Sequence, residues 1–263
     1  MIPRAEIVAW RNIVPWQTSE QVEQDLVICR ALVEIFSDKI LSENLAFRGG
    51  TALYKLHMPS LLRYSEDIDL VQVKPGSIGN IIDRLRERLA FLGKPRINQK
   101  AFNNTIVFRY ASELEPVAQM KLKVEINCRE HFSVYGYKKI PFSLSSGWYK
   151  GKCEITTFEI EDLMGTKMRA LYQRKKGRDL FDLYHVLNET KANPEHIVKA
   201  FRKYMEHEGN KVSQKEFILN MEDKMQKDRF ISDINSLLRP GESFEMQKAW
   251  EVVCGSLPTI TPY

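Results

Sequence analysis

Residues 47–73, FRGGTALYKLHMPSLLRYSEDIDLVQV, contain the strongest structural signal in the chain. A glycine pair opens a short apolar helix and DIDLVQV is typical of a buried strand, so the stretch predicts helix, turn and strand. Asp67 and Asp69 are two positions apart, and on a strand they project from one face with Cα atoms about 6–7 Å apart. One divalent ion can bridge two carboxylates at that spacing. Mg²⁺ or Mn²⁺ is the expected cofactor, because hard cations prefer oxygen ligands.

The paired aspartates also have a simpler explanation, since polar alternation on a solvent-facing strand produces Asp-x-Asp by chance. Glu125 favours the metal interpretation. It lies in the alternating segment 120–126, opposite the apolar face, and could supply a third carboxylate from a neighbouring strand. A surface ion pair with Lys121 or Lys123 is the alternative. Three carboxylates suit a two-metal site, which stabilises the attacking and leaving oxygens of a phosphoryl or nucleotidyl transfer.

Gly49, Gly50 and Thr51 come directly before the predicted helix ALYKL. Backbone N–H groups at a helix start, together with the Thr51 hydroxyl, form an anion site that suits a triphosphate. An ordinary helix N-cap with glycine in a tight turn is the alternative. Lys55 follows within about one helical turn of Thr51, so it is a further candidate for binding the nucleotide.

Arg63 and Ser65 continue the two-residue alternation that leads into Asp67 and Asp69. If the strand begins that early, all four side chains face the same way. Arg63 could then neutralise a phosphate or orient a carboxylate, and Ser65 could donate to a phosphate oxygen. The edge of a surface strand is the alternative.

The chain divides into a mixed N-terminal part and a helical C-terminal part. Capping-box spacing from Thr18 to Gln21 predicts a helix of about 18 residues. Segments 103–110 and 120–126 alternate and predict antiparallel strands of one sheet. After about Glu159 helical periodicity dominates. Further helices are expected at 77–92, 194–208, 213–238 and 243–253.

The composition is that of an ordinary globular protein. Of the 263 residues 43% are hydrophobic and 28% charged, which allows a sizeable core. No apolar run approaches the roughly 20 residues of a membrane span, and residues 1–10 lack a secretory signal, so we expect a cytoplasmic protein without a membrane partner. The four cysteines are scattered, without zinc or disulfide spacing. The net charge of +5 permits a nucleic-acid partner without requiring one.

The segment from Gly49 to Leu70, GGTALYK followed by RYSEDIDL, resembles the AbiEii/AbiGii-type nucleotidyltransferase toxins, including the MenT-like enzymes, within the DNA polymerase β superfamily. The resemblance continues through Lys123-Val124-Glu125 and into LMGTKMRALYQRKKGRDLFDLYHVL, so it covers residues 47–187. It implies an α+β fold with a polymerase β-like mixed sheet flanked by helices in residues 1–158. A helical region, 159–263, would contribute the later motif.

In that family a glycine turn holds the triphosphate, paired aspartates bind metal, and a later Lys and Arg-Asp motif complete the site. The matching positions here are Gly49, Gly50, Asp67, Asp69, Lys167, Arg178, Asp179 and Asp182. The resemblance implies that Lys167 contacts phosphate, that Arg178 and Asp179 form an organising ion pair, and that Asp182 is a catalytic or positioning base. Many relatives have Gly-Ser where this chain has Gly-Gly-Thr, and Thr51 supplies a comparable hydroxyl.

The residues themselves leave alternatives open in this second motif. Lys167 lies on an apolar helical stripe, where it either meets an anion or extends to solvent as a core lysine. The spacing of Asp179 and Asp182 also fits helix capping. Six positive charges between Lys167 and Arg178 suit phosphate binding, or a solvated helix end.

The resemblance implies an NTP as substrate, RNA and specifically the 3′ end of tRNA as acceptor, and a separate antitoxin protein as partner. Competing functions are a kinase-like phosphotransfer, nucleotidylation of a protein, and RNA binding without catalysis. Asp67 and Asp69 argue against the last. Transfer of label from the γ-phosphate of the NTP would indicate kinase-like phosphotransfer, whereas transfer from the α-phosphate would indicate nucleotidyl transfer.

Overall fold

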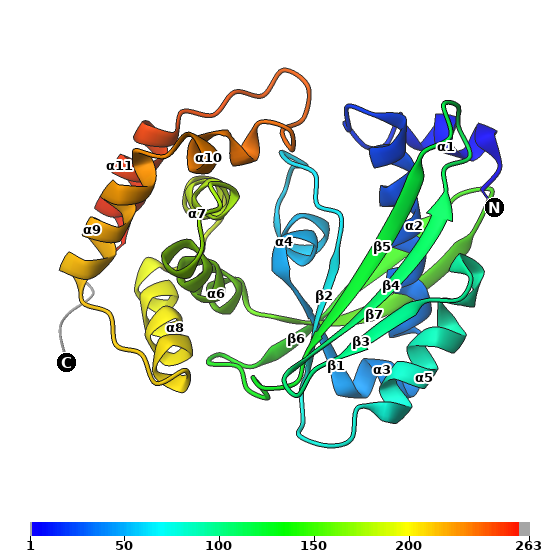
Figure 1. The fold of residues 1–263 in the computed structure, drawn as a ribbon, viewed down its shortest axis with the longest axis horizontal. Helices are drawn as coiled ribbons and strands as arrows, with labels where there is room; N and C mark the ends of the chain where they lie inside the picture. Colours follow the sequence, from blue (N-terminus) through cyan, green and yellow to red (C-terminus); the bar gives the residue numbers. More distant parts are fainter. Residues whose placement is uncertain (1, 258–263) are drawn as a thin grey trace. The chain divides into compact units, whose positions relative to one another are not determined.

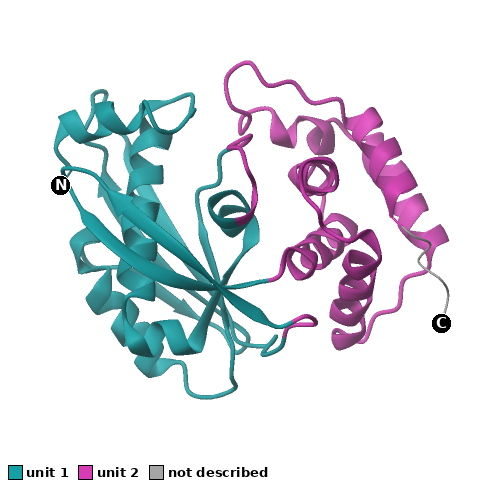
Figure 2. Ribbon diagram, turned by 180° about the vertical axis from the view of Figure 1, so that it is seen from behind, with its two compact units in different colours: residues 1–56, 64–132, 136–158 teal, residues 57–63, 133–135, 159–263 magenta. Residues whose placement is uncertain are grey.

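The computed structural model describes residues 2–257, which form two compact units (Figure 2). Of the described residues, unit 1 comprises 2–56, 64–132 and 136–158, and unit 2 comprises 57–63, 133–135 and 159–257. The chain therefore passes to unit 2 and back twice before it enters unit 2 for good at Glu159. Among the described residues, no helix is both long and apolar enough to cross a membrane.

Unit 1 is built on a mixed seven-stranded sheet in the order β3-β4-β5-β2-β1-β7-β6 (Figure 1). The β1–β7 and β2–β5 pairs are parallel, and the other neighbouring strands are antiparallel. The strands are β1 (Leu45–Arg48), β2 (Ile68–Gln72), β3 (Arg96–Gln99), β4 (Asn103–Ala111), β5 (Gln119–Asn127), β6 (Tyr137–Ser145) and β7 (Lys150–Phe158).

Helix α2 (Ser19–Phe36) forms the core of unit 1 with the sheet, packing on β5, β6 and β7. Its predicted capping box is confirmed: the Thr18 hydroxyl accepts from the Gln21 N–H, and the Gln21 side chain accepts from the Thr18 N–H. The antiparallel pairing of β4 with β5 is confirmed too. The other helical elements that lie in unit 1 or begin there are α1 (Arg4–Trp10), α3 (Lys39–Asn44), α4 (Gly49–Ala52), the π-helical turn η1 (Leu53–His57), α5 (Gly79–Arg88) and the 3₁₀ turn η2 (Ala90–Leu92).

Unit 2 is helical, as the periodicity after Glu159 predicts. Its helices α6 and α8 pack together, and α7 packs against α6 and α11. The bounds are α6 (Ile160–Gln173), α7 (Arg178–Glu189), α8 (Pro194–His207), α9 (Gln214–Met225), α10 (Asp228–Ile231), the 3₁₀ turn η3 (Ser232–Ile234) and α11 (Met246–Ser256).

The expectation of one helix over 213–238 is wrong, because the chain breaks after Met225 into α9, α10 and η3. The break turns Phe230 inward, and its carbonyl oxygen then lies so near Gly177 that a Cβ there would be 2.3 Å from it. A continuous helix would carry Phe230 away from this contact. The helix predicted at 77–92 is similarly divided into α5 and η2.

Candidate active site

The predicted carboxylates gather on two neighbouring strands of unit 1. Asp69 lies in β2 and pairs in register with Glu125 of the parallel strand β5, while Asp67 directly precedes β2. The ammonium group of Lys123 lies between them, 2.8 Å from Asp67 Oδ2 and 3.6 Å from Glu125 Oε1. All these side chains are partly exposed. We call Asp67, Asp69, Glu125 and Lys123 the carboxylate cluster.

The negative charges of all three carboxylates act on the ammonium group of Lys123. Burial lowers the pKa of Lys123, but the hydrogen bond to Asp67 and the negative charges of Asp67, Glu125 and Asp69 raise it more, so its pKa lies above the usual value. An ammonium ion is therefore held where the negative potential of the cluster is concentrated.

The donor chemistry of the carboxylate cluster fits a hard divalent cation. It offers carboxylate oxygens from three residues, the ligands that Mg²⁺ and Mn²⁺ prefer, and the Lys123 ammonium already pairs with two of them. As the side chains stand, no group of three or more His, Cys, Asp and Glu residues within residues 2–257 is placed so that it could hold a metal ion. Asp67 and Glu125 are instead turned toward Lys123.

Gly49 is required by the position of Asp69. Its φ of +82° lies in the left-handed region, and a Cβ on Gly49 would lie 2.1 Å from Asp69 Oδ2. Residue 49 is therefore a glycine because the carboxylate of Asp69 packs directly on its backbone. Gly50 follows it in the single turn of α4, as predicted for the glycine turn.

Thr51 and Ser65 have a different role from the one expected. The Thr51 hydroxyl, which is 2% exposed, donates to the carbonyl of Asp67 at 2.5 Å and lies 2.9 Å from Ser65 Oγ. These bonds tie α4 to the segment that leads into β2. The Thr51 hydroxyl therefore holds the backbone at Asp67, and Ser65 Oγ contacts Thr51.

Lys55 is also placed differently from its prediction as a phosphate ligand. It lies in the π-helical turn η1 (Leu53–His57), where its ammonium binds Asp25 Oδ2 of α2 at 2.6 Å. The indole N–H groups of Trp10 and Trp16 donate to the same carboxylate at 3.0 and 2.9 Å. Lys55 thus closes a buried polar network in unit 1, because a buried carboxylate requires a counter-charge.

Arg63 contradicts the expectation that it continues strand β2. The strand begins at Ile68, and Arg63 belongs to unit 2, where it forms an isolated bridge with Leu238. Its guanidinium donates twice to Asp182, Nε to Oδ1 at 2.7 Å and Nη2 to Oδ2 at 2.6 Å. Both side chains are buried, so this is a fixed bidentate pair.

Lys167 joins the same buried network of unit 2. Its ammonium lies 2.9 Å from Asp182 Oδ2 and 3.2 Å from Asp179 Oδ1. Arg174 adds a bidentate pair to Asp179, at 2.7 and 2.8 Å. We call Arg63, Lys167, Asp179 and Asp182, together with the half-exposed Arg174 at their edge, the buried network. Lys167 was expected either to meet an anion or to extend to solvent. The structure shows that it meets an anion, and that the anion is provided by carboxylates of its own chain.

Asp182 is unsuited to be a proton acceptor. Burial raises its pKa, but the charges and hydrogen bonds of Arg63 and Lys167 lower it further, and the net result is well below the usual value. Both carboxylate oxygens already accept from Arg63. Of the two roles that the resemblance implies, these contacts favour the positioning of Arg63 and Lys167 over a catalytic base.

Arg178 does not pair with its neighbour Asp179 as expected. Its guanidinium donates to both oxygens of Asp233 in η3, at 2.9 and 3.1 Å, and Lys176 Nζ donates to Asp233 at 3.0 Å. Asp179 is occupied by Arg174 and Lys167 instead. The two residues of the Arg-Asp motif therefore make separate contacts: Arg178 binds Asp233 of η3, and Asp179 belongs to the buried network.

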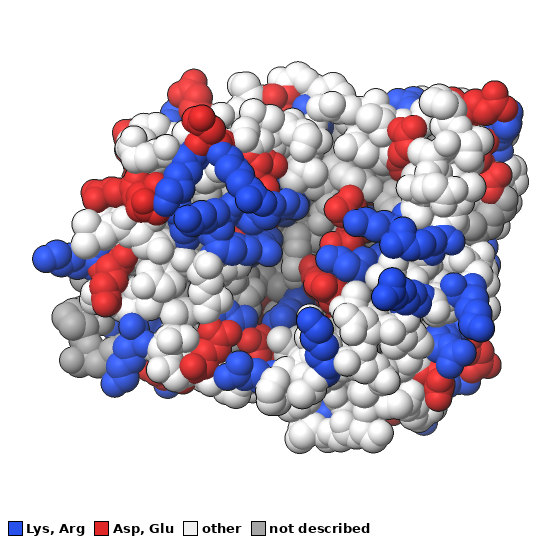
Figure 3. All heavy atoms as spheres, in the orientation of Figure 1, with Lys and Arg blue, Asp and Glu red and all other residues white. Residues whose placement is uncertain are grey.

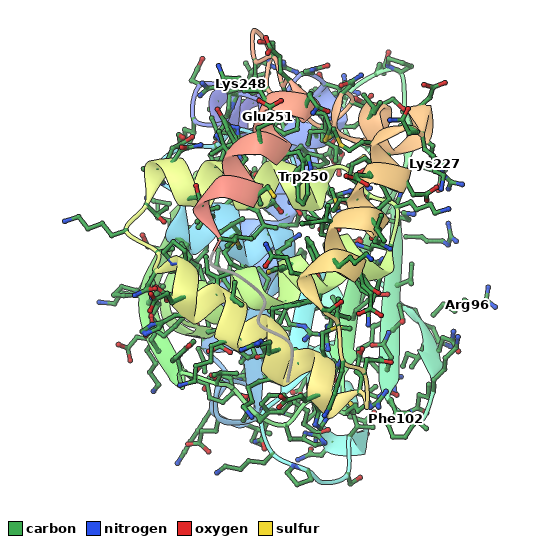
Figure 4. All side chains as sticks on the ribbon, turned by 90° about the vertical axis from the view of Figure 1, so that its left-hand side faces the viewer. Arg96, Phe102, Lys227, Lys248, Trp250 and Glu251 are labelled. Atoms are coloured by element: carbon green, nitrogen blue, oxygen red, sulfur yellow. The ribbon has the colours of Figure 1, made fainter. Side chains whose placement is uncertain are left out.

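The basic run from Lys167 to Arg178 is largely neutralised by carboxylates. Arg169 binds Glu208 at 3.0 Å, and the pairs of Lys167, Arg174, Lys176 and Arg178 have been given above. Lys175 is exposed, and Lys227 pairs with Asp223 nearby. Figure 3 shows Lys and Arg side chains gathered over α7 and α10, and Figure 4 shows Lys227 extending outward. We call the exposed face formed by Arg174, Lys175, Lys176, Arg178 and Lys227 the basic patch.

Unit 2 also has a hollow of about 190 Å³ that no predicted site residue lines. Its walls combine aromatic rings with charges of both signs, and Lys248 of α11 is visible in Figure 4. The lining residues are Tyr184, His185, Glu242, Ser243, Phe244, Glu245 and Lys248.

Sequence reasoning missed several partners that define these clusters. Asp25 and Asp233 receive Lys55 and Arg178, and neither carried a motif. The sequence predicted Lys123 only as an alternative ion-pair partner of Glu125 on the surface of the strand. Its position two residues before Glu125, on the same side of an alternating strand, was the signal available for including it in the site.

The comparisons with known proteins place the chain in a family. A family model described as the nucleotidyl transferase AbiEii toxin of a type IV toxin–antitoxin system matches residues 30–253. No curated protein matches.

Two solved structures share the mixed sheet with flanking helices. MenT4, a nucleotidyltransferase toxin of Mycobacterium tuberculosis H37Rv, is 14% identical over 97% of this chain and 87% of its own, with a TM-score of 0.62. JHP933 of Helicobacter pylori is 18% identical over 91% of this chain and 90% of its own, with a TM-score of 0.57. At such identities the structures establish the fold, and the family rests on the model match over most of the chain. The chain belongs to the AbiEii family of nucleotidyltransferase toxins.

Proposed function

We propose that this nucleotidyltransferase moves a nucleoside monophosphate from an NTP to an RNA acceptor in a reaction that depends on Mg²⁺ or Mn²⁺. The observation that carries the proposal is the placement of three carboxylates on adjacent strands around Lys123: Asp67 and Glu125 pair with its ammonium, and Asp69 lies in register with Glu125. Carboxylates on adjacent strands with a shared focus suit two-metal nucleotidyl transfer.

Asp67, Asp69 and Glu125 would hold the metal. It would neutralise charge on the triphosphate and favour the ionised acceptor hydroxyl. The acceptor hydroxyl gives up its proton to solvent, its oxygen attacks the α-phosphorus, the bond from the α-phosphorus to the oxygen that bridges to the β-phosphate breaks, and pyrophosphate leaves. The part of this chain is to fix the carboxylates: Gly49 admits Asp69 at close range, and Thr51 holds the backbone of Asp67.

The triphosphate is assigned to the turn at Gly49 and Gly50, whose backbone can be approached closely. The resemblance to the family separately implies a phosphate contact for Lys167. Arg63, Lys167 and Arg174 outnumber the two carboxylates of the buried network, which leaves an excess of positive charge. Asp179 and Asp182 fix the directions of these cations. Lys167 is the residue through which that charge would meet phosphate, with Asp182 positioning it.

RNA is proposed as the acceptor because the basic patch contains five cations against three carboxylates, Asp179, Asp223 and Asp233. A surplus of cations on an exposed face favours a polyanion. The 3′ end of tRNA is our leading acceptor, and an antitoxin protein encoded separately is the proposed partner, on the strength of the family.

The test is incubation of the purified chain with Mg²⁺, total tRNA and each of the four NTPs labelled at the α-phosphate. The matched control is the double variant Asp67→Asn, Asp69→Asn, which keeps side-chain size and removes charge. Label in RNA with the natural chain alone, together with released pyrophosphate, supports the proposal and identifies the NTP.

Other outcomes name other functions. Label in protein instead of RNA would replace the acceptor and keep the metal site. Transfer from a γ-labelled NTP, with no transfer of α-label, would make the chain a kinase-like enzyme. No transfer to any acceptor, with tRNA still bound, would leave RNA binding without catalysis and overturn the proposal.

A further inference from the structure

Lys123 has an unusual position for a lysine on a strand with an exposed face. Its ammonium lies between Asp67 at 2.8 Å and Glu125 at 3.6 Å, and the charge of Asp69 also acts on it. The side chain is 31% exposed, so it could extend into solvent, yet it is directed at the carboxylates. The cluster therefore contains its own cation.

Charge balance gives this arrangement a physical reason. Asp67 and Glu125 lie within 4 Å of the same ammonium, and neighbouring carboxylates of like charge repel one another. An ammonium ion at their focus offsets the repulsion. A divalent metal would do the same with the same oxygens, so Lys123 and the metal are competitors for Asp67 and Glu125.

The side chain of lysine suits such an exchange. Its charge is compact and is carried on a flexible stem of four carbons, so the ammonium can leave the carboxylates without any movement of strand β5. Lys121, two positions earlier on the same side of the strand, is exposed and has no contact with the cluster among the ion pairs of the described residues. The position of the charge, and not merely its presence on the strand, distinguishes Lys123.

We propose that Lys123 is a tethered cation that holds the metal position of the carboxylate cluster and is displaced when the metal binds. The proposal rests on the proposed function, since it takes Asp67, Asp69 and Glu125 as the metal ligands. Lys123 is then a positioning residue that keeps the carboxylates together without metal and weakens metal binding by competition.

The test measures Mn²⁺ binding by the electron paramagnetic resonance of free Mn²⁺, without nucleotide, for the natural chain and three variants. Lys123→Met removes the charge at similar volume, Lys123→Arg keeps a charge, and Lys121→Met is the matched control. We expect Lys123→Met to bind Mn²⁺ about tenfold or more tightly than the natural chain. Lys121→Met should remain within about twofold, and Lys123→Arg should retain most of the competition.

A second measurement is the thermal midpoint in EDTA and in Mg²⁺. Lys123→Met should melt lower than the natural chain in EDTA, because its carboxylates repel, and should gain more from Mg²⁺. A merely structural lysine would lower both midpoints equally. Mn²⁺ affinity that is unchanged or weaker in Lys123→Met, with the natural chain binding Mn²⁺, overturns the tethered cation alone. Absence of Mn²⁺ binding in every variant overturns the proposed metal site as well.

Discussion

The carboxylate cluster of unit 1 and the buried network of unit 2 are ionic clusters of opposite design. In the first, three carboxylates share one lysine and the side chains are 25–34% exposed where ion pairs are formed. In the second, Arg63, Asp179 and Asp182 are at most 2% exposed and Lys167 is 9% exposed, while the third cation, Arg174, is 51% exposed. The first has surplus negative charge that is open to solvent. The second pairs two buried cations with two buried carboxylates, and its additional cation, Arg174, lies at the surface.

The difference in burial suggests different roles for the two ionic clusters. A partly exposed cluster is screened by water and exchanges its partners at little cost, so it suits an ion that enters and leaves. Buried charges are costly unless they are fully paired, so a buried network holds geometry rather than exchanging ions. The following substitutions should therefore separate activity from stability.

The largest effect is expected from Asp69→Asn. It removes a proposed metal ligand that lies on Gly49, so nucleotidyl transfer should fall at least about 10³-fold, equivalent to about 4 kcal/mol in the barrier. The free energy of unfolding should change by less than about 1 kcal/mol, because the cluster is already self-repelling. Single-turnover rates and urea unfolding provide the two measurements. A large loss of stability would make Asp69 a structural residue and end the comparison.

Asp182→Asn should produce the reverse of that pattern in stability. It leaves Arg63 and Lys167 buried with too little counter-charge, so the free energy of unfolding of unit 2 should fall by about 3 kcal/mol. Asp223→Asn is the matched control, because Asp223 is 62% exposed and pairs with Lys227 at the surface. If urea unfolding shows equal changes for the two variants, burial is not what distinguishes the clusters.

The sequence predicted the elements whose pattern is local. The capping residues of α2 and the alternation of β4 and β5 lie within single segments, and each was found. Strands β1 and β3 have four residues each, too few for alternation to be distinguished from a turn. The β6–β7 hairpin has mostly intermediate or exposed positions, so it lacks the buried stripe that identifies a strand.

Candidate site residues could be predicted from the sequence where they lie close together on one strand. They could not be predicted where their contacts depend on a residue far away in the sequence. Asp67 and Asp69 follow from their spacing. Arg63 meets Asp182 across 119 residues, and Arg178 meets Asp233 across 55. Hydrophobic periodicity carries no information about pairs so far apart in the sequence. Cations that were predicted to bind phosphate are therefore found paired with carboxylates of the same chain.

Glu23 of α2 sharpens the comparison, because it is a buried carboxyl group whose pKa moves opposite to that of Asp182. Burial raises the pKa of Glu23 to about 7, and its carboxylate accepts from the backbone N–H of Glu113. The folded pKa exceeds the unfolded one, so its contribution is complete below about pH 4.5 and is lost as the pH rises through 7. We expect the free energy of unfolding to fall by about 2 kcal/mol between pH 5 and 8 from this group.

The control for that pH dependence is Glu23→Gln, which cannot titrate and keeps an oxygen that can accept from Glu113. Its free energy of unfolding should be flatter with pH over the same range. Urea unfolding at pH 5, 6, 7 and 8 gives the slope for both chains. An identical slope in the variant would show that Glu23 ionises without cost, as an exposed carboxylate does.

The smallest effect is expected at the basic patch, where charge is exposed and mostly paired. Lys175→Gln should weaken tRNA binding about two- to fivefold and reduce the slope of log affinity against log salt by about one, because a single phosphate contact is lost. Lys121→Gln on unit 1 is the matched control and should change neither. Fluorescence anisotropy with labelled tRNA at several salt concentrations measures both quantities. Equal losses in the two variants would mean that tRNA responds to net charge alone, and the patch would then differ from the rest of the surface only in composition.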